Sequence, residues 1–217
     1  MFVKICGITN EDDALLAVAL GADAVGFVFA PSVRQIAVQK VYDITRRLPP
    51  EILTVGVFRD EHPKRVVEMT QSAGLRCAQL HGHESPDDVA YVSRHIRTVI
   101  KAVTAGSVDA VRASSFNTSM VLVDAPAPGS GEVFDWGLAG ELPEGLNIIL
   151  AGGLTPENVA SGISQVRPFG VDVSSGVEAS PGRKDAILMK RFIEAARLAT
   201  PADYNGGEKA PYDWMHE

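Results

Sequence analysis

Cysteine is scarce in this chain, which has only Cys6 and Cys77 among its 217 residues. The two form no C-x-x-C pair, and no cysteine and histidine spacing is of the zinc-binding type. The sequence therefore indicates neither a disulfide framework nor a metal site. Free thiols are typical of a reducing compartment, so we expect the protein in the cytoplasm.

An excess of positive charge is also absent. The chain has 20 Lys and Arg against 27 Asp and Glu, a formal net charge of -7, so we expect no nucleic-acid partner. Its start lacks the basic segment and long apolar run of a secretory signal. The apolar stretch 14–31 is divided by Gly21 and Asp23 into a helix and a strand, so we expect no membrane span.

What the chain does contain is a repeating strand and helix unit. Apolar runs typical of buried parallel strands begin near residues 2, 24, 52, 76, 97, 119, 146 and 169, a mean spacing of about 24 residues. Helical segments lie between them. Eight such units predict a single α/β domain over residues 1–199, a closed (β/α)8 TIM barrel. No G-x-G-x-x-G motif follows the first strand, which disfavours a dinucleotide-binding sheet.

Local signals set the limits of the expected elements. Strands are expected at 53–58, 147–150 and 170–173, and the last helix at 184–199. The seventh helix is expected at 155–166, with Thr155 as its N-cap and Pro156 at the first helical position. Residues 200–217 are polar and contain Gly and Pro, so we expect a loosely attached tail, with Tyr204, Tyr212 and Trp214 as possible anchors.

Reactive side chains stand where several strands end. The carboxyl ends of barrel strands converge on one face, where ligands bind, so residues far apart in sequence should meet there. A single Cys or His at a strand end is more often a buried structural residue, and the functional interpretation depends on the group. This group comprises Cys6, Gln79, His81, Asp124 and Asp172.

Small residues follow strands seven and eight, at Gly152-Gly153 and Ser174-Ser175-Gly176. Backbone N–H groups can approach a ligand closely at such positions, as they do at phosphate sites in barrels. A tight turn is the alternative interpretation of the glycine pair. Two such segments on adjacent strands favour a site for a phosphorylated small molecule.

Long motifs also resemble a known family. In order they are KICGIT, GADAVGFVF, VGVF, QLHG, FDW, GGLTPENV, PFGVDVSSGVE and PGRKD, and together they resemble phosphoribosylanthranilate isomerases from the start to about residue 199. The resemblance implies a cofactor-free Amadori rearrangement in tryptophan biosynthesis. In it, N-(5-phosphoribosyl)anthranilate becomes 1-(o-carboxyphenylamino)-1-deoxyribulose 5-phosphate.

The resemblance also implies roles for individual residues. Cys6 matches the family's general base and Asp124 its general acid, so the thiol must reach its thiolate form and the carboxyl must hold a proton when it acts. Arg34 matches the arginine that binds the anthranilate carboxylate, a task suited to a planar bidentate donor. Gln79, His81 and Asp172 match further positions in contact with the substrate.

One loop of the chain departs from the family pattern. The loop DAPAPGSGEVFDW after strand six, with a brief helix expected at 136–139, is shorter than is common in the family, so its closure over substrate is expected to differ.

The rival activity is the aminoaldose isomerisation of histidine biosynthesis, alone or in a dual-substrate barrel, but that relative has Asp in place of Cys6. A non-catalytic barrel that binds a phosphorylated metabolite is disfavoured by the presence of both Cys6 and Asp124. The chain is expected to be a monomer or a homodimer.

Overall fold

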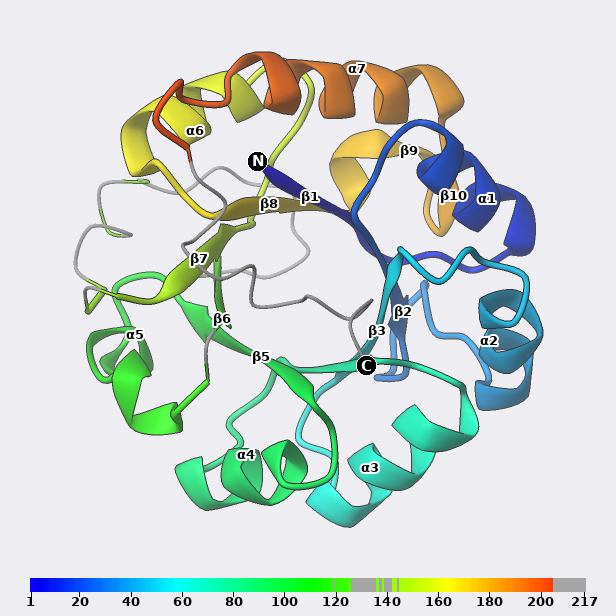
Figure 1. Cartoon of the computed structure of the whole chain (residues 1–217), viewed down its shortest axis with the longest axis vertical. Coiled ribbons are helices and arrows are strands. Elements are labelled where there is room, and N and C mark those ends of the chain that lie inside the picture. Colours follow the sequence, from blue (N-terminus) through cyan, green and yellow to red (C-terminus); the bar gives the residue numbers. More distant parts are fainter. Residues whose placement is uncertain (119, 126–135, 137, 139–141, 144, 205–217) are drawn as a thin grey trace.

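A closed barrel of parallel strands forms the centre of the molecule, and helices surround it (Figure 1). The computed structural model describes residues 1–118, 120–125, 136, 138, 142–143 and 145–204. Neighbouring strands pair in chain order, and β8 pairs with β1 to close the sheet. The predicted (β/α)8 barrel is confirmed. The barrel strands are β1 (Phe2–Ile5), β2 (Ala24–Val28), β3 (Leu53–Phe58), β4 (Cys77–Leu80), β5 (Thr98–Thr104), β6 (Met120–Asp124), β7 (Asn147–Leu150) and β8 (Gly170–Val173).

The helices start where the chain supplies caps. Asn10 accepts the backbone N–H of Asp13 at 2.9 Å and so caps the first helix, whose opening turn is acidic. Ser85 and Asp88 form a capping box before α4. In the ranges that the structure describes, the α-helices are α1 (Glu11–Ala19), α2 (Val38–Thr45), α3 (Pro63–Ser72), α4 (Pro86–Ser93), α5 (Val108–Val111), α6 (Val159–Val166) and α7 (Ala186–Leu198), and the 3-10 helices include η1 (Ala113–Phe116) and η3 (Ser175–Val177). No helix in the described ranges is long and apolar enough to cross a membrane.

The start of α6 differs from the prediction. The structure begins this helix at Val159, and Thr155 is not its N-cap. The Asn158 side chain accepts the Thr155 N–H at 2.8 Å and donates to the Gly153 carbonyl at 2.9 Å. These local bonds compete with helical ones, so the segment before Val159 forms a turn. The brief helix expected at 136–139 includes residues outside the described ranges.

Alternation along the strands separates two cores. Side chains that face outward pack against the helices in the larger apolar cluster. Side chains that face inward form a second apolar cluster within the barrel, which includes Phe2, Leu53, Ile100, Met120 and Ile149. These residues lie in the early and middle parts of their strands. The polar inward residues follow them toward the carboxyl ends, so the apolar cluster is the floor of the mouth.

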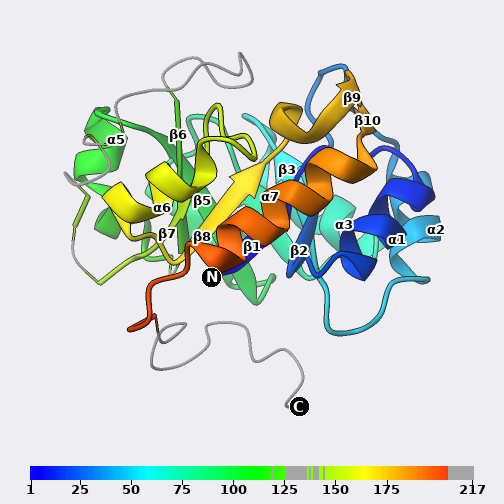
Figure 2. The ribbon, with the colours of Figure 1, turned by 90° about the horizontal axis from the view of Figure 1, so that it is seen from above.

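Two features lie at opposite ends of the barrel. Figure 2 shows a hairpin of β9 (Glu178–Ser180) and β10 (Arg183–Lys184), which the sequence analysis did not predict, at the end away from the N-terminus. At the other end, the Tyr204 hydroxyl donates to the Phe169 carbonyl at 2.7 Å and anchors the start of the tail. The other two candidate anchors, Tyr212 and Trp214, lie outside the described residues.

A buried ion pair joins two of the loops at the mouth. Lys101 on β5 is fully buried and its ammonium lies 2.9 Å from the Glu84 carboxylate. Glu84 also accepts the backbone N–H groups of Asp60 and Gly82, while Lys101 donates to the Gly82 carbonyl. The pair therefore fixes the loop after β4, which carries His81, to the loop after β3.

We expect Lys101→Met to lower the free energy of unfolding by about 3–5 kcal/mol, because it leaves the Glu84 carboxylate buried without its cation. Urea unfolding measures the change. The double variant Lys101→Met/Glu84→Gln should regain part of the loss, and Lys64→Met, which removes an exposed partner of Glu68, should change stability by less than about 0.5 kcal/mol. Equal losses in the single and double variants would contradict this account.

Candidate active site

A cavity of about 480 Å³ opens at the carboxyl ends of the strands. Its lining comes from the ends of several strands, which converge as predicted. All the site residues expected from the sequence line it: Cys6, Arg34, Gln79, His81, Asp124, Gly152, Gly153, Asp172, Ser174, Ser175 and Gly176.

Cys6 follows the last residue of β1, and its backbone N–H donates to the Val173 carbonyl at 2.8 Å. The backbone is therefore fixed across the junction of β1 and β8, and Cys6 as a whole is 7% exposed. Burial raises the pKa of the Cys6 thiol, while the nearby Lys4 ammonium opposes that rise. The thiol is thus a buried acid beside a buried cation.

Asp124 ends β6 and joins a short hydrogen-bonded chain. One carboxylate oxygen lies 3.1 Å from His81 Nε2, and the Gln79 amide nitrogen lies 2.9 Å from His81 Nδ1. The other oxygen accepts the N–H of Ala125 at 2.8 Å. With the Gln79 amide as donor, Nδ1 accepts and Nε2 carries the imidazole proton toward Asp124. His81 is therefore placed to exchange a proton with this carboxyl group.

Arg34 is held inside the mouth and is not a solvated loop charge. Its guanidinium makes a bidentate pair with Glu178 at 2.7 and 2.8 Å. Lys184 lies 2.9 Å from the same carboxylate and also donates to the Ser174 carbonyl at 3.0 Å. Although burial favours the protonated form of Glu178, the bonds from Arg34 and Lys184 lower its pKa. Glu178 therefore carries the negative charge between two cations.

The segments after β7 and β8 approach one another through glycine. A Cβ at Gly176 would lie 1.9 Å from the Leu154 carbonyl oxygen, and one at Gly152 would lie 2.6 Å from the Ala125 nitrogen. Gly152 also has a φ of 80°, in the left-handed region that favours glycine. These segments therefore pack closely against their neighbours at the wall of the cavity that they line.

Three further charged residues at the site, Lys4, Glu178 and Lys184, were not predicted from the sequence. Lys4 had a signal, since it is the only charge in the buried strand FVKI. Glu178 and Lys184 stand in a hairpin whose partner, Arg34, is 144 residues from Glu178 in the chain. Nothing in their local sequence indicates that pairing.

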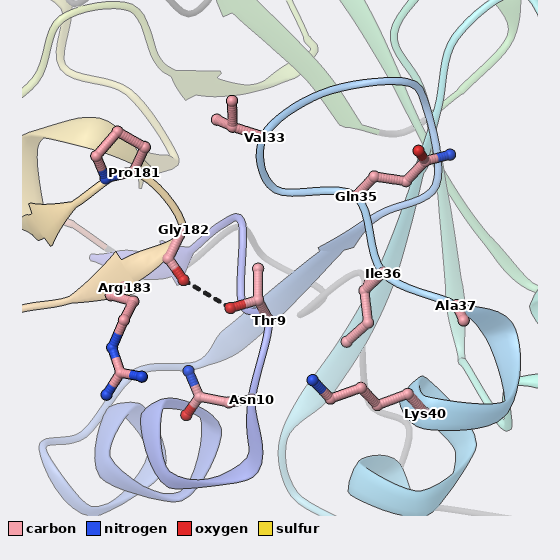
Figure 3. Close-up of a pocket in the computed structure, with 10 residues that line it drawn as sticks. All are labelled: Thr9, Asn10, Val33, Gln35, Ile36, Ala37, Lys40, Pro181, Gly182 and Arg183. Carbon is pink, nitrogen blue, oxygen red and sulfur yellow. Dashed lines mark hydrogen bonds between the residues drawn. The ribbon is translucent and has the colours of Figure 1, made fainter.

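A second hollow of about 400 Å³ lies beside the mouth (Figure 3). It is lined by the loop after β2, the start of α1 and the turn between β9 and β10. Thr9 Oγ1 donates to the Gly182 carbonyl at 2.6 Å and ties that turn to the loop after β1. Lys40 and Arg183 also line this hollow. Across the described ranges, no three His, Cys, Asp or Glu side chains are grouped so as to hold a metal ion.

Comparisons with known proteins agree with this architecture. A family model described as N-(5'phosphoribosyl)anthranilate (PRA) isomerase matches residues 3–195. The N-(5'-phosphoribosyl)anthranilate isomerase of Desulforudis audaxviator is 48% identical over 204 residues, which are 91% of this chain and 98% of that protein.

Solved structures give the same result. A phosphoribosyl anthranilate isomerase in complex with reduced 1-(o-carboxyphenylamino)-1-deoxyribulose 5-phosphate is 42% identical, with a TM-score of 0.81 over 91% of this chain and 99% of that one. The dimeric isomerase of Thermotoga maritima, solved as generated monomers, is 41% identical, with a TM-score of 0.81 over the same shares. The chain therefore belongs to the N-(5'-phosphoribosyl)anthranilate isomerase family.

Proposed function

We propose that Cys6 is the general base and Asp124 the general acid of the isomerisation that this chain catalyses, the conversion of N-(5'-phosphoribosyl)anthranilate to 1-(o-carboxyphenylamino)-1-deoxyribulose 5-phosphate in tryptophan biosynthesis. The observation that carries the assignment is that a thiol on β1 and a carboxyl on β6 line one cavity. Asp124 has a histidine at 3.1 Å for proton exchange, and the Lys4 ammonium near Cys6 favours its thiolate form.

The reaction needs one proton given and one taken. Asp124 protonates the furanose ring oxygen, the bond from that oxygen to C1 breaks, and the nitrogen lone pair forms the Schiff base. The Cys6 thiolate then removes the C2 proton, and the electron pair of that bond forms the C1–C2 double bond while the iminium becomes an amine. Tautomerisation of this enolamine gives the ketone. Asp124 ends as a carboxylate and Cys6 as a thiol, so the net change in protons is zero, and exchange with solvent restores both.

The substrate's two anionic ends need separate sites. Backbone groups of Gly152, Gly153 and the 174–176 segment are proposed to hold the phosphate, supported by their close packing at the cavity wall. Arg34 is proposed to bind the anthranilate carboxylate. Its guanidinium would then pair with both the substrate and Glu178. In addition, Gln79, His81 and Asp172 are proposed to contact the sugar.

The cellular location of the protein and its oligomeric state are inferred from its cysteines and from a relative. We propose that the protein works in the cytoplasm, supported by its two free cysteines, both buried. As partners we propose only the phosphorylated substrate and, if the chain is not a monomer, a second copy of itself. The dimer named for the Thermotoga relative is compatible with that alternative.

Cys6→Ala and Asp124→Asn should each lower kcat by about 10²-fold or more, because each removes one proton-transfer group. Loss of anthranilate-type fluorescence measures turnover, and circular dichroism checks that the variants fold. Cys77→Ala is the matched control, because Cys77 is also a buried thiol inside the barrel but does not line the cavity. It should keep wild-type kcat. Near-normal turnover in a folded Cys6→Ala or Asp124→Asn protein would remove that residue from its role.

Arg34→Met should raise KM and also lower kcat, because the substrate loses a bidentate partner and the reacting carbons lose their alignment. Steady-state kinetics separate the two effects. Arg46→Met is the control: Arg46 is an exposed residue on the outer surface after α2, whose ion-pair partner is Asp43 at 3.6 Å, and its loss should change neither constant. Unchanged kinetics in Arg34→Met would show that the arginine serves only to pair with Glu178.

A further inference from the structure

Lys4 is a fully buried charge directly below the proposed base. It stands two residues before Cys6, and both side chains face the inside of the barrel because strand residues alternate. An ammonium that loses all contact with water is costly unless it is paired and hydrogen-bonded. Its position in an otherwise apolar strand therefore calls for partners within the barrel.

Asp172 supplies the first partner. Lys4 and Asp172 stand opposite each other in the register of β1 and β8, and Nζ lies 2.8 Å from the carboxylate. Although burial disfavours the ammonium form, the Asp172 carboxylate and then Cys6 raise the pKa of Lys4, so the residue stays charged. An ammonium has three protons to donate, and this pair uses one of them.

Cys6 Sγ lies near the same ammonium, and a glycine leaves room for both groups. A Cβ at Gly26 on the neighbouring strand β2 would lie 2.8 Å from the Cys6 sulfur and 3.2 Å from Lys4 Nζ. Both atoms therefore converge on one spot that only a residue without a side chain leaves open. A larger residue there would displace the thiol or the ammonium.

Four charged groups act on Cys6 from the elements packed around it. Lys4 on β1 and Lys184 on β10 favour the thiolate, and Asp172 on β8 disfavours it. Arg34, in the loop after β2, is a further cation close enough to interact with Cys6. Burial raises the pKa of Cys6, and of the charged groups around it Lys4 opposes this rise most strongly. The opposing charges of Lys4 and Asp172 thus both act on the pKa of the proposed base.

We propose that the Lys4 ammonium, fixed by Asp172 across the junction of β1 and β8, stabilises the Cys6 thiolate that removes the substrate proton. Lys4 keeps its own proton throughout, and Cys6 takes the proton from C2, so Lys4 is a positioning residue that acts through Cys6. The inference rests on the proposed role of Cys6 as base. If the ion pair served only to close the barrel, loss of either member would loosen the same junction. The pKa of the thiol would then change in the same direction in both variants.

The test uses the full-length chain without substrate, in a Cys77→Ala background, so that Cys6 is the one cysteine. Its rate of alkylation by iodoacetamide is measured against pH, because this neutral reagent reacts with the thiolate and is not itself steered by charge. Lys4→Met should move the midpoint to higher pH by about one unit or more, which is about a tenfold loss of thiolate below the midpoint. Asp172→Asn should move the midpoint to lower pH.

Opposite shifts support the inference, and shifts in the same direction, or no shift in Lys4→Met, would overturn it. If Lys4→Met does not fold, the double variant Lys4→Met/Asp172→Asn removes both charges and avoids an unpaired carboxylate. Its midpoint should lie above that of Asp172→Asn alone, and an equal midpoint would overturn the inference. Turnover by the Cys77→Ala parent separates the two hypotheses: a folded but inactive parent contradicts the proposed function, whereas normal turnover with unmoved midpoints contradicts only the role of Lys4.

Discussion

The junction between β1 and β8 is the contact on which the rest of the structure depends. Without it the eight strands would form an open sheet, and the ends of β1 and β6 would not face a common space. Four residue pairs join the two strands, and one of them is the buried ion pair of Lys4 with Asp172. This junction therefore closes the barrel and also sets the surroundings of the proposed base.

A single strand shows how the chain divides its tasks. Phe2, Lys4 and Cys6 point inward at increasing height along β1. Phe2 belongs to the apolar cluster within the barrel, Lys4 makes the ion pair, and Cys6 lines the cavity. The apolar floor excludes water from below, so the charges above it act on one another at low dielectric. The start of β1 thus contributes to the apolar core, and the end of the same strand leads into the proposed catalytic site.

The sequence predicted the barrel well because its signals are local. Continuous apolar runs located β3, β7 and β8 at the bounds that the structure has. The start of α6 was wrong because Thr155 and Pro156 are ordinary helix-start signals, while the competing bonds of Asn158 depend on the turn that they create. The expected site residues lie together because strand ends converge in any such barrel. The partners of Arg34 and Lys4 could not be predicted, since Glu178 and Asp172 are 144 and 168 residues away and only the closed fold brings them near.

The central claim is that this barrel isomerises its substrate with its own thiol and carboxyl groups. The most direct test mixes the purified wild-type chain with freshly generated N-(5'-phosphoribosyl)anthranilate in a metal chelator and follows both fluorescence and product mass. The account predicts rapid fluorescence decay to a single product whose mass equals that of the substrate. A folded protein that leaves the fluorescence unchanged, or that releases free anthranilate by hydrolysis, would contradict it.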